Sequence, residues 1–126
     1  MKKEKIILIS VIVIVVLTIG AVVFQKTAPG KYDAFAACLK EKNVTFFGAF
    51  WCPHCQSQKK LFGNSAKRLP YVECSTPDGK NQTQICKDEN IKSYPTWRFA
   101  DGSEQTGEVS LENLAEKSGC ELPASK

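Results

Sequence analysis

The sequence predicts an α/β domain of ordinary size behind an N-terminal apolar helix. A length of 126 residues leaves room for one domain and a short appendage. Apolar runs of strand length alternate with amphipathic segments of helix length over most of the chain. The beginning of the chain contains instead a long uncharged stretch rich in Ile and Val. These patterns predict one folded domain and one separate hydrophobic segment.

The uncharged stretch is long enough to cross a membrane. Residues 6–24 carry no charge, and a helix of this length spans about 28 Å, close to a hydrocarbon core of ~30 Å. Lys2, Lys3 and Lys5 precede the stretch with one acid, Glu4. This excess of basic residues favours an N-terminus in the cytoplasm and the rest of the chain on the other side.

A cleaved signal peptide is the alternative for this segment. Its apolar region would normally be shorter, and no clean Ala-X-Ala site follows the stretch. We therefore expect a retained signal-anchor and an extracytoplasmic domain, in the periplasm, at the cell surface or in a lumen. The expected boundaries are residues 1–25 for the basic end and anchor, 26–31 for a linker, and 32–126 for the domain.

The charges beyond the anchor nearly balance. Without the three lysines and the acid at the beginning, the totals of 17 basic and 13 acidic residues become 14 and 12, a net charge of about +2. These residues are spread without long runs, so the sequence does not predict binding to nucleic acid.

The first half of the domain contains a helix, a strand and a second helix. Residues 32–41 have apolar side chains at a helical spacing, and 44–50 form an apolar run typical of a strand covered on both faces. Pro53 suits the first turn of a helix. We expect this second helix to continue to about residue 69, before Pro70.

The second half continues the alternation and ends in a helix. Turn residues 100–102 predict a hairpin, and Ser110 and Gly119 are typical first and last boundary residues of a helix. After the first helix the order is therefore β-α-β-α-β-β-α. The expected elements are a strand at 71–74, a helix at 81–89, strands at 96–99 and 103–107, and a helix from 110 to about 118.

Two cysteines separated by Pro53 and His54 lie where the first strand passes into a helix. A Cys-X-X-Cys at such a position is typical of a dithiol redox site. The unpaired N–H groups and positive dipole end of the helix favour a thiolate, which is the attacking species in disulfide exchange. We expect Cys52 to attack and Cys55, one turn later, to resolve the mixed disulfide.

His54 is expected to favour the Cys52 thiolate when its imidazole is protonated. An inert exposed side chain is the alternative for this residue. A structural zinc site is the alternative for the whole motif, but it needs four ligands, and the chain has one histidine and no second close cysteine pair. The sequence therefore predicts no metal and no cofactor.

All six cysteines lie beyond the apolar stretch, and an even number outside the cytoplasm predicts disulfides. With one working pair set aside, the other four allow three connectivities. We favour structural bridges, with a relay that hands electrons onward as the alternative. The favoured pairs are Cys74–Cys86, which closes a short loop, and Cys38–Cys120, which ties the start of the domain to its last helix.

The order of elements and the position of the redox pair resemble thioredoxin. The segment Tyr94-Pro95-Thr96 lies where that family has a cis-proline loop against the redox pair. The resemblance implies a central mixed sheet flanked by helices. It also implies that the backbone of this loop pairs with a substrate chain like an added strand, with Pro95 shaping the groove and Tyr94 and Thr96 bordering it. Trp51 is expected to face the substrate, with a core position as the alternative.

Several further segments match a narrower group. They are Gly48-Ala49-Phe50-Trp51-Cys52-Pro53-His54-Cys55, Gln58-Lys59-Lys60-Leu61-Phe62-Gly63, Tyr71-Val72-Glu73-Cys74, Cys86-Lys87 and Tyr94-Pro95-Thr96-Trp97. They resemble the thioredoxin-like domain that is fused to, or works beside, bacterial homologues of vitamin K epoxide reductase. The resemblance implies oxidation of exported protein thiols, with electrons passing through the membrane reductase to a quinone. With one predicted spanning segment here, we expect that partner to be a separate chain.

The direction of electron flow has three interpretations. Pro-His also separates the cysteines of the strong oxidant DsbA, whose reduced form is stabilised, and this favours oxidation of substrates. An exported reductase or isomerase is the first alternative, and a redox-inactive binding module is the second.

One position departs from the family pattern. Thioredoxin and DsbA place a buried acid six residues before the attacking cysteine, where this chain has Phe46. Glu73 is a candidate substitute as proton acceptor for the resolving cysteine, and water is the alternative.

Overall fold

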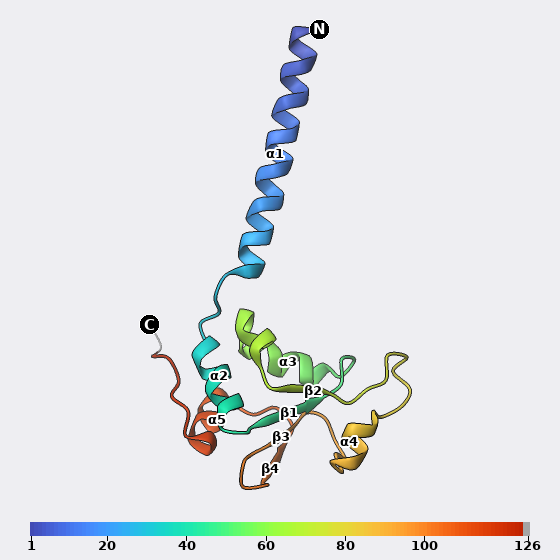
Figure 1. The fold of residues 1–126 in the computed structure, drawn as a ribbon, viewed down its shortest axis with the longest axis vertical. Helices are drawn as coiled ribbons and strands as arrows, with labels where there is room; N and C mark the ends of the chain where they lie inside the picture. Colours follow the sequence, from blue (N-terminus) through green and yellow to red (C-terminus); the bar gives the residue numbers. More distant parts are fainter. Residues whose placement is uncertain (125–126) are drawn as a thin grey trace.

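The computed structural model describes residues 1–124, so the last two residues of the predicted domain lie outside the described part. A long helix is joined by a short linker to an α/β domain (Figure 1). The elements in chain order are α1 Lys2–Thr27, α2 Asp33–Glu41, β1 Thr45–Gly48, α3 Pro53–Leu61, the 3-10 helix η1 Gly63–Arg68, β2 Tyr71–Glu73, α4 Gln84–Asp88, β3 Thr96–Arg98, β4 Glu104–Thr106 and α5 Leu111–Ser118.

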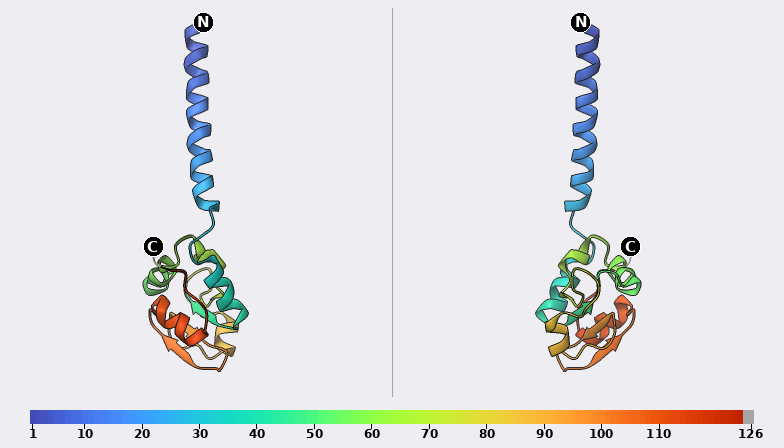
Figure 2. Two further views of the ribbon diagram at one scale, coloured as in Figure 1. Left: turned by 90° about the vertical axis from the view of Figure 1, so that its left-hand side faces the viewer. Right: turned by 90° about the vertical axis from the view of Figure 1, so that its right-hand side faces the viewer.

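Helix α1 extends away from the domain, as the two side views of Figure 2 show. Its segment Lys2–Gln25 is long and apolar enough to cross a membrane, and none of its most apolar window is buried against the rest of the chain. A signal sequence near the N-terminus can also be long and apolar enough to meet this criterion. The exposed apolar surface suggests anchoring in a membrane, because such a surface is unfavourable in water.

The sheet has the strand order β2-β1-β3-β4. Strand β1 pairs in parallel with β2 and antiparallel with β3, and β3 pairs antiparallel with β4. The mixed sheet flanked by helices that the thioredoxin resemblance implies is therefore confirmed. Phe46 of β1 lies opposite Tyr71 on one side and Trp97 on the other, which places it at the centre of the sheet.

Two clusters of buried side chains pack on the sheet. Neighbouring residues of a strand point to opposite faces, so Phe46 and Phe47 belong to different clusters. The larger one, which we call the main cluster, contains the ring of Phe46 stacked on Trp97 with centroids 4.5 Å apart. Its other buried members are Phe35, Ala36, Leu39, Val44, Ala49, Cys52, Cys55, Phe62, Leu69, Phe99, Val109, Leu114 and Cys120. The small cluster consists of Phe47, Cys74, Cys86 and Ile91.

The helix expected from residue 53 to about 69 is wrong in its second half. Helix α3 ends at Leu61, and a separate 3-10 helix begins at Gly63, whose φ is +52°. A left-handed residue cannot continue an α-helix, and glycine adopts this conformation at little cost. The break lets the chain turn before strand β2 begins.

All four strands and helix α4 are shorter than expected, and the difference is greatest for strand β1 and helix α4. Strand β1 ends at Gly48 because the next residues turn, with the Cys52 N–H donating to the Ala49 carbonyl at 3.0 Å. Helix α4 begins at Gln84 because Gln82 forms a bridge with Ser75. Helix α5 begins and ends as expected. Its boundary residues are Ser110, whose Oγ accepts from Asn113 N at 3.2 Å, and Gly119, whose φ is +72°.

The end of α1 and the linker that follows it lie against η1. Tyr32 N donates to Ser65 Oγ at 2.9 Å, and Asn64 Nδ2 donates to the Gln25 carbonyl at 3.2 Å. A Cβ added at Gly30 would lie 2.1 Å from Ser65 Oγ, so only glycine permits this approach. Residues far apart in the sequence thus join the linker to one end of the domain.

Candidate redox site

The two motif cysteines begin helix α3. Cys52 is the residue before the helix, in an extended conformation, and Pro53 follows in the first turn, where its missing N–H costs little. Cys52 is 5% exposed and Cys55 is 1% exposed, and both are free thiols. Cys52 is thus slightly the more accessible of the two, and its sulfur lies at the helix end that favours an anion.

Cys55 is suited to remain protonated at neutral pH. Burial raises the pKa of its thiol to about 12, against the opposing effects of a hydrogen bond with the Ala49 backbone and the positive charge of Lys59. A thiol of this kind is a poor first attacker, because exchange proceeds through the thiolate. The arrangement therefore favours Cys52, rather than Cys55, as the first attacking sulfur.

His54 pairs with Glu108, which lies in the segment before α5. Its Nδ1 lies 2.7 Å from Glu108 Oε1, and the two side chains are 71% and 43% exposed. An exposed pair of this kind adds little to stability. The sequence analysis missed Glu108, and no local pattern connects these residues, because they are 54 positions apart.

The loop around Pro95 lies beside Cys52. The Tyr94–Pro95 peptide bond is cis, and Cys52 Sγ lies 3.7 Å from the Tyr94 carbonyl oxygen. The Pro95 carbonyl accepts from Gly107 N at 2.8 Å. Thr96 is 1% exposed and its hydroxyl donates to the Ser93 carbonyl, so its side chain is buried. The expectation that this residue borders a groove therefore concerns its backbone alone.

Trp51 lies at the surface rather than in the core. Its side chain is half exposed, like that of its neighbour Phe50, and its ring meets Tyr94 edge to face at 6.2 Å. Trp51 Nε1 donates to Ser75 Oγ at 2.8 Å. Because Ser75 directly follows Cys74, the tryptophan is positioned by the segment that the Cys74–Cys86 disulfide holds.

The other four cysteines form two disulfide bonds, which is one of the three possible connectivities. One bond ties helix α2 to the segment after α5, across 82 positions, and the other closes a loop of 12 positions before and within α4. These bonds are Cys38–Cys120 and Cys74–Cys86.

Glu73 contacts backbone groups near the motif rather than standing alone. Its Oε1 accepts from Ser75 N at 2.8 Å and Phe50 N at 3.2 Å, and its Oε2 accepts from the Tyr71 hydroxyl at 2.7 Å. Burial and the hydrogen bond to Glu73 raise the pKa of the Tyr71 phenol, which therefore stays neutral. Sequence analysis did not single out Tyr71, because a tyrosine at the start of a strand is ordinary.

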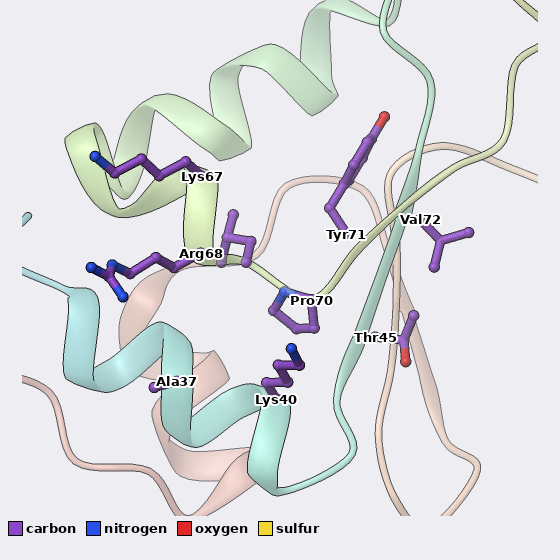
Figure 3. A pocket seen from close by; sticks show the side chains of 9 residues that line it. Ala37, Lys40, Thr45, Lys67, Arg68, Pro70, Tyr71 and Val72 are labelled. Carbon is purple, nitrogen blue, oxygen red and sulfur yellow. The ribbon is translucent and has the colours of Figure 1, made fainter. Parts of the chain in front are cut away.

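A pocket of about 620 Å³ lies between α2, η1 and β2, and no cysteine lines it. Figure 3 shows Lys40, Lys67 and Arg68 around it, with Tyr71 and Val72 from the strand. Arg68 is paired with Asp33 at 3.0 Å. Within residues 1–124, no three His, Cys, Asp or Glu side chains gather as a metal ion would require.

Residues 23–118 match the family model for thioredoxin. The chain belongs to the thioredoxin family. The thiol-disulfide oxidoreductase LTO1 of Arabidopsis thaliana is 45% identical over 94 residues, which are 71% of this chain and 24% of that protein. The thioredoxin domain-containing protein 5 homolog of Drosophila melanogaster is 39% identical over 69 residues, 51% of this chain and 16% of that protein.

The chain thus spans a quarter or less of these curated relatives. What it shares with them is the thioredoxin domain. An apolar helix that could span a membrane precedes this domain.

Proposed function

We propose that this thioredoxin domain is anchored in a membrane by α1 and oxidises dithiols in exported proteins. The observation that carries the proposal is the contrast among its cysteines. Four are closed in bridges, whereas Cys52 and Cys55 are free at the beginning of α3, beside the Tyr94 carbonyl. A pair so placed can cycle between dithiol and disulfide while the rest of the domain stays cross-linked.

The reaction begins with a disulfide between Cys52 and Cys55. A substrate thiolate attacks Cys52 Sγ, the bond between the two cysteines breaks, and its electron pair stays on Cys55 Sγ, which then takes up a proton. A second substrate thiolate attacks the substrate sulfur of the mixed disulfide and releases Cys52 as a thiolate. The substrate has then lost two electrons and the enzyme has gained them.

The substrate segment is proposed to lie across the cis-proline loop. Tyr94 and the buried Pro95 form this loop, and the half-exposed Trp51 ring meets Tyr94 edge to face. The carbonyl of Tyr94 already faces Cys52, so a chain paired there would bring its cysteine to the attacking sulfur.

The domain is proposed to lie outside the cytoplasm, because Lys2, Lys3 and Lys5 precede the apolar segment. Its reduced pair is proposed to be reoxidised by a quinone-linked membrane protein of the vitamin K epoxide reductase type. The Pro53-His54 dipeptide supports the oxidising direction, because its DsbA counterpart separates cysteines whose reduced form is stabilised.

The direct test is the reduction potential of the Cys52/Cys55 pair in the full chain, measured against glutathione. We expect a value close to that of DsbA, about −120 mV, rather than that of thioredoxin, about −270 mV. A value near thioredoxin's would favour an exported reductase or isomerase instead. If no pair can be reduced before the fold is lost, the domain is a binding module.

The partners can be trapped covalently. In Cys55→Ala the mixed disulfide at Cys52 cannot be resolved internally, so substrates and the membrane partner should accumulate as linked species. Cys52→Ala is the matched control and should capture none. Capture by Cys52→Ala alone would reverse the two roles.

A further inference from the structure

A lysine lies one turn after the resolving cysteine on the same helix. Residues four apart on a helix share a face, so Lys59 and Cys55 point to the same side of α3. Lys59 is partly buried, and its Nζ lies 3.4 Å from the centre of the Tyr71 ring. A cation over an aromatic face is attracted by the negative face of the ring, and the contact strengthens when water is excluded.

The same ring approaches the resolving cysteine. A Cβ added at Gly48 would lie 2.9 Å from Cys55 Sγ and 3.0 Å from Tyr71 Cε2. The missing side chain of Gly48 therefore leaves a space into which both groups extend. Tyr71 is fixed at its other end, since its hydroxyl donates to Glu73, whose second oxygen is held by two backbone N–H groups.

We propose that Lys59 supplies the positive charge that stabilises the Cys55 thiolate during disulfide exchange, and that Tyr71 is the positioning residue that holds Lys59 there. This inference depends on the proposed function, because it assumes that the pair exchanges disulfides. Strand β1 has no carboxylate to assist the resolving cysteine, because Phe46 is apolar and packs in the main cluster. The proposal assigns this assistance to a cation on α3 instead.

The step that benefits is the opening of the enzyme's own disulfide. The incoming thiolate forms a bond to Cys52 Sγ, and the electron pair of the broken bond remains on Cys55 Sγ. This anion forms in a site that is almost closed to water, where an unpaired charge is costly. The Lys59 ammonium compensates the charge until the sulfur takes a proton from solvent.

Glu73 is poorly suited to this task. Its carboxylate already accepts three hydrogen bonds, and its negative charge would oppose an anion on Cys55. The positive charge of Lys59, in contrast, acts against burial and lowers the pKa of the Cys55 thiol. We therefore assign Glu73 to holding Tyr71 and the backbone before the motif.

The test compares two adjacent lysines of α3. Lys59→Met removes the charge over Tyr71 but keeps much of the aliphatic chain, and Lys60→Met removes an exposed charge one residue later. The rate at which dithiothreitol reduces the oxidised full chain is followed by tryptophan fluorescence at neutral pH. We expect Lys59→Met to be slower by about tenfold, because the rate of exchange depends on how well the leaving thiolate is stabilised.

Lys60→Met should stay within about twofold of the parent, and Lys59→Arg should recover most of the rate, since it restores the charge. Tyr71→Phe keeps the ring and should have a small effect, whereas Tyr71→Leu should lower the rate as Lys59→Met does. Because Lys59→Met and Tyr71→Leu both act through the charge of Lys59, the variant that combines them should be no slower than either single variant.

The inference is overturned if Lys59→Met reacts at the parent rate or if Lys60→Met slows the reaction equally. It is also overturned if the effects of Lys59→Met and Tyr71→Leu on the rate multiply when the two are combined. Failure of the proposed function looks different. The parent itself would then form no reversible disulfide, or its potential would match thioredoxin's while the order of rates among these variants stayed the same.

Discussion

Phe46 and Phe47 are neighbours in one strand, yet they belong to regions that are stabilised in different ways. Phe46 packs in the main cluster, where stacked rings from the strands and helices exclude water. Phe47 packs in the small cluster. Half of the buried members of this cluster are the disulfide-bonded Cys74 and Cys86. One face of the sheet has a large apolar core that a disulfide also crosses, whereas on the other face a disulfide supplies half of the few buried residues.

This difference bears on the redox site, which lies at the junction of the two regions. Cys52 and Cys55 are members of the main cluster, whereas Tyr94 packs against both clusters. Trp51 is held through Ser75, next to the bridged Cys74. The two free sulfur atoms are thus fixed by the core, and the surface around them is fixed by the Cys74–Cys86 disulfide.

The largest effect is expected from removing the bridge of the main cluster. Replacing Cys38 and Cys120 together by Ala should lower the free energy of unfolding by about 4 kcal/mol, since the bond closes a loop of 82 positions. Urea denaturation measures this. The loss should be global, with a single transition, and a separate early transition in α4 would contradict the comparison.

Replacing Cys74 and Cys86 together by Ala should have a smaller effect, about 3 kcal/mol, because the loop has 12 positions. The loss should begin locally, since few other groups hold the small cluster. Hydrogen exchange should speed up first in α4 and around Ser75. The variant with Cys38 and Cys120 replaced serves as the control. Equal hydrogen exchange of α4 and the segment around Ser75 in the two double variants would show that the two regions unfold as one.

Gly48→Ala should destabilise the protein by about 2 kcal/mol, because a methyl group there overlaps both Cys55 Sγ and Tyr71 Cε2. The same change should alter the rate of disulfide exchange, since it separates these groups. Gly102→Ala is a control with open space around it, and its cost should come from its φ of +82° alone. An unaltered exchange rate in Gly48→Ala would contradict the close packing proposed here.

The smallest effect is expected far from the junction. Ser110→Ala removes the acceptor for Asn113 N at the beginning of α5 and should cost about 1 kcal/mol. Thermal unfolding measures the loss, and the exchange rate at Cys52 should not change. Ser110→Asp is the control, because aspartate caps a helix equally well.

The sequence predicts best where one local rule decides the structure. The order of strands and helices, the start of α3 at Pro53 and the end of α5 at Gly119 all follow from the residues at those positions. The break at Gly63 was not foreseen, because helical spacing continues past it and only the left-handed backbone reveals it.

Contacts between distant segments were harder to predict than the elements themselves. The pairing of His54 with Glu108 and the stacking of Lys59 on Tyr71 depend on how α3 packs against later parts of the chain. Lys59 looks in the sequence like one more lysine of a solvated helix face. Only the packed structure separates it from Lys60, its exposed neighbour.

The contacts between the linker and η1 also limit how far the reacting sulfur can travel. With α1 in a membrane, as proposed above, the domain would search for partners in a thin layer along the bilayer, rather than in the full volume of a compartment. Confinement to such a layer raises the effective concentration of any partner in the same membrane. Encounters with a reoxidising membrane protein would then be governed by lateral diffusion, and long flexible substrates would be reached more readily than compact ones.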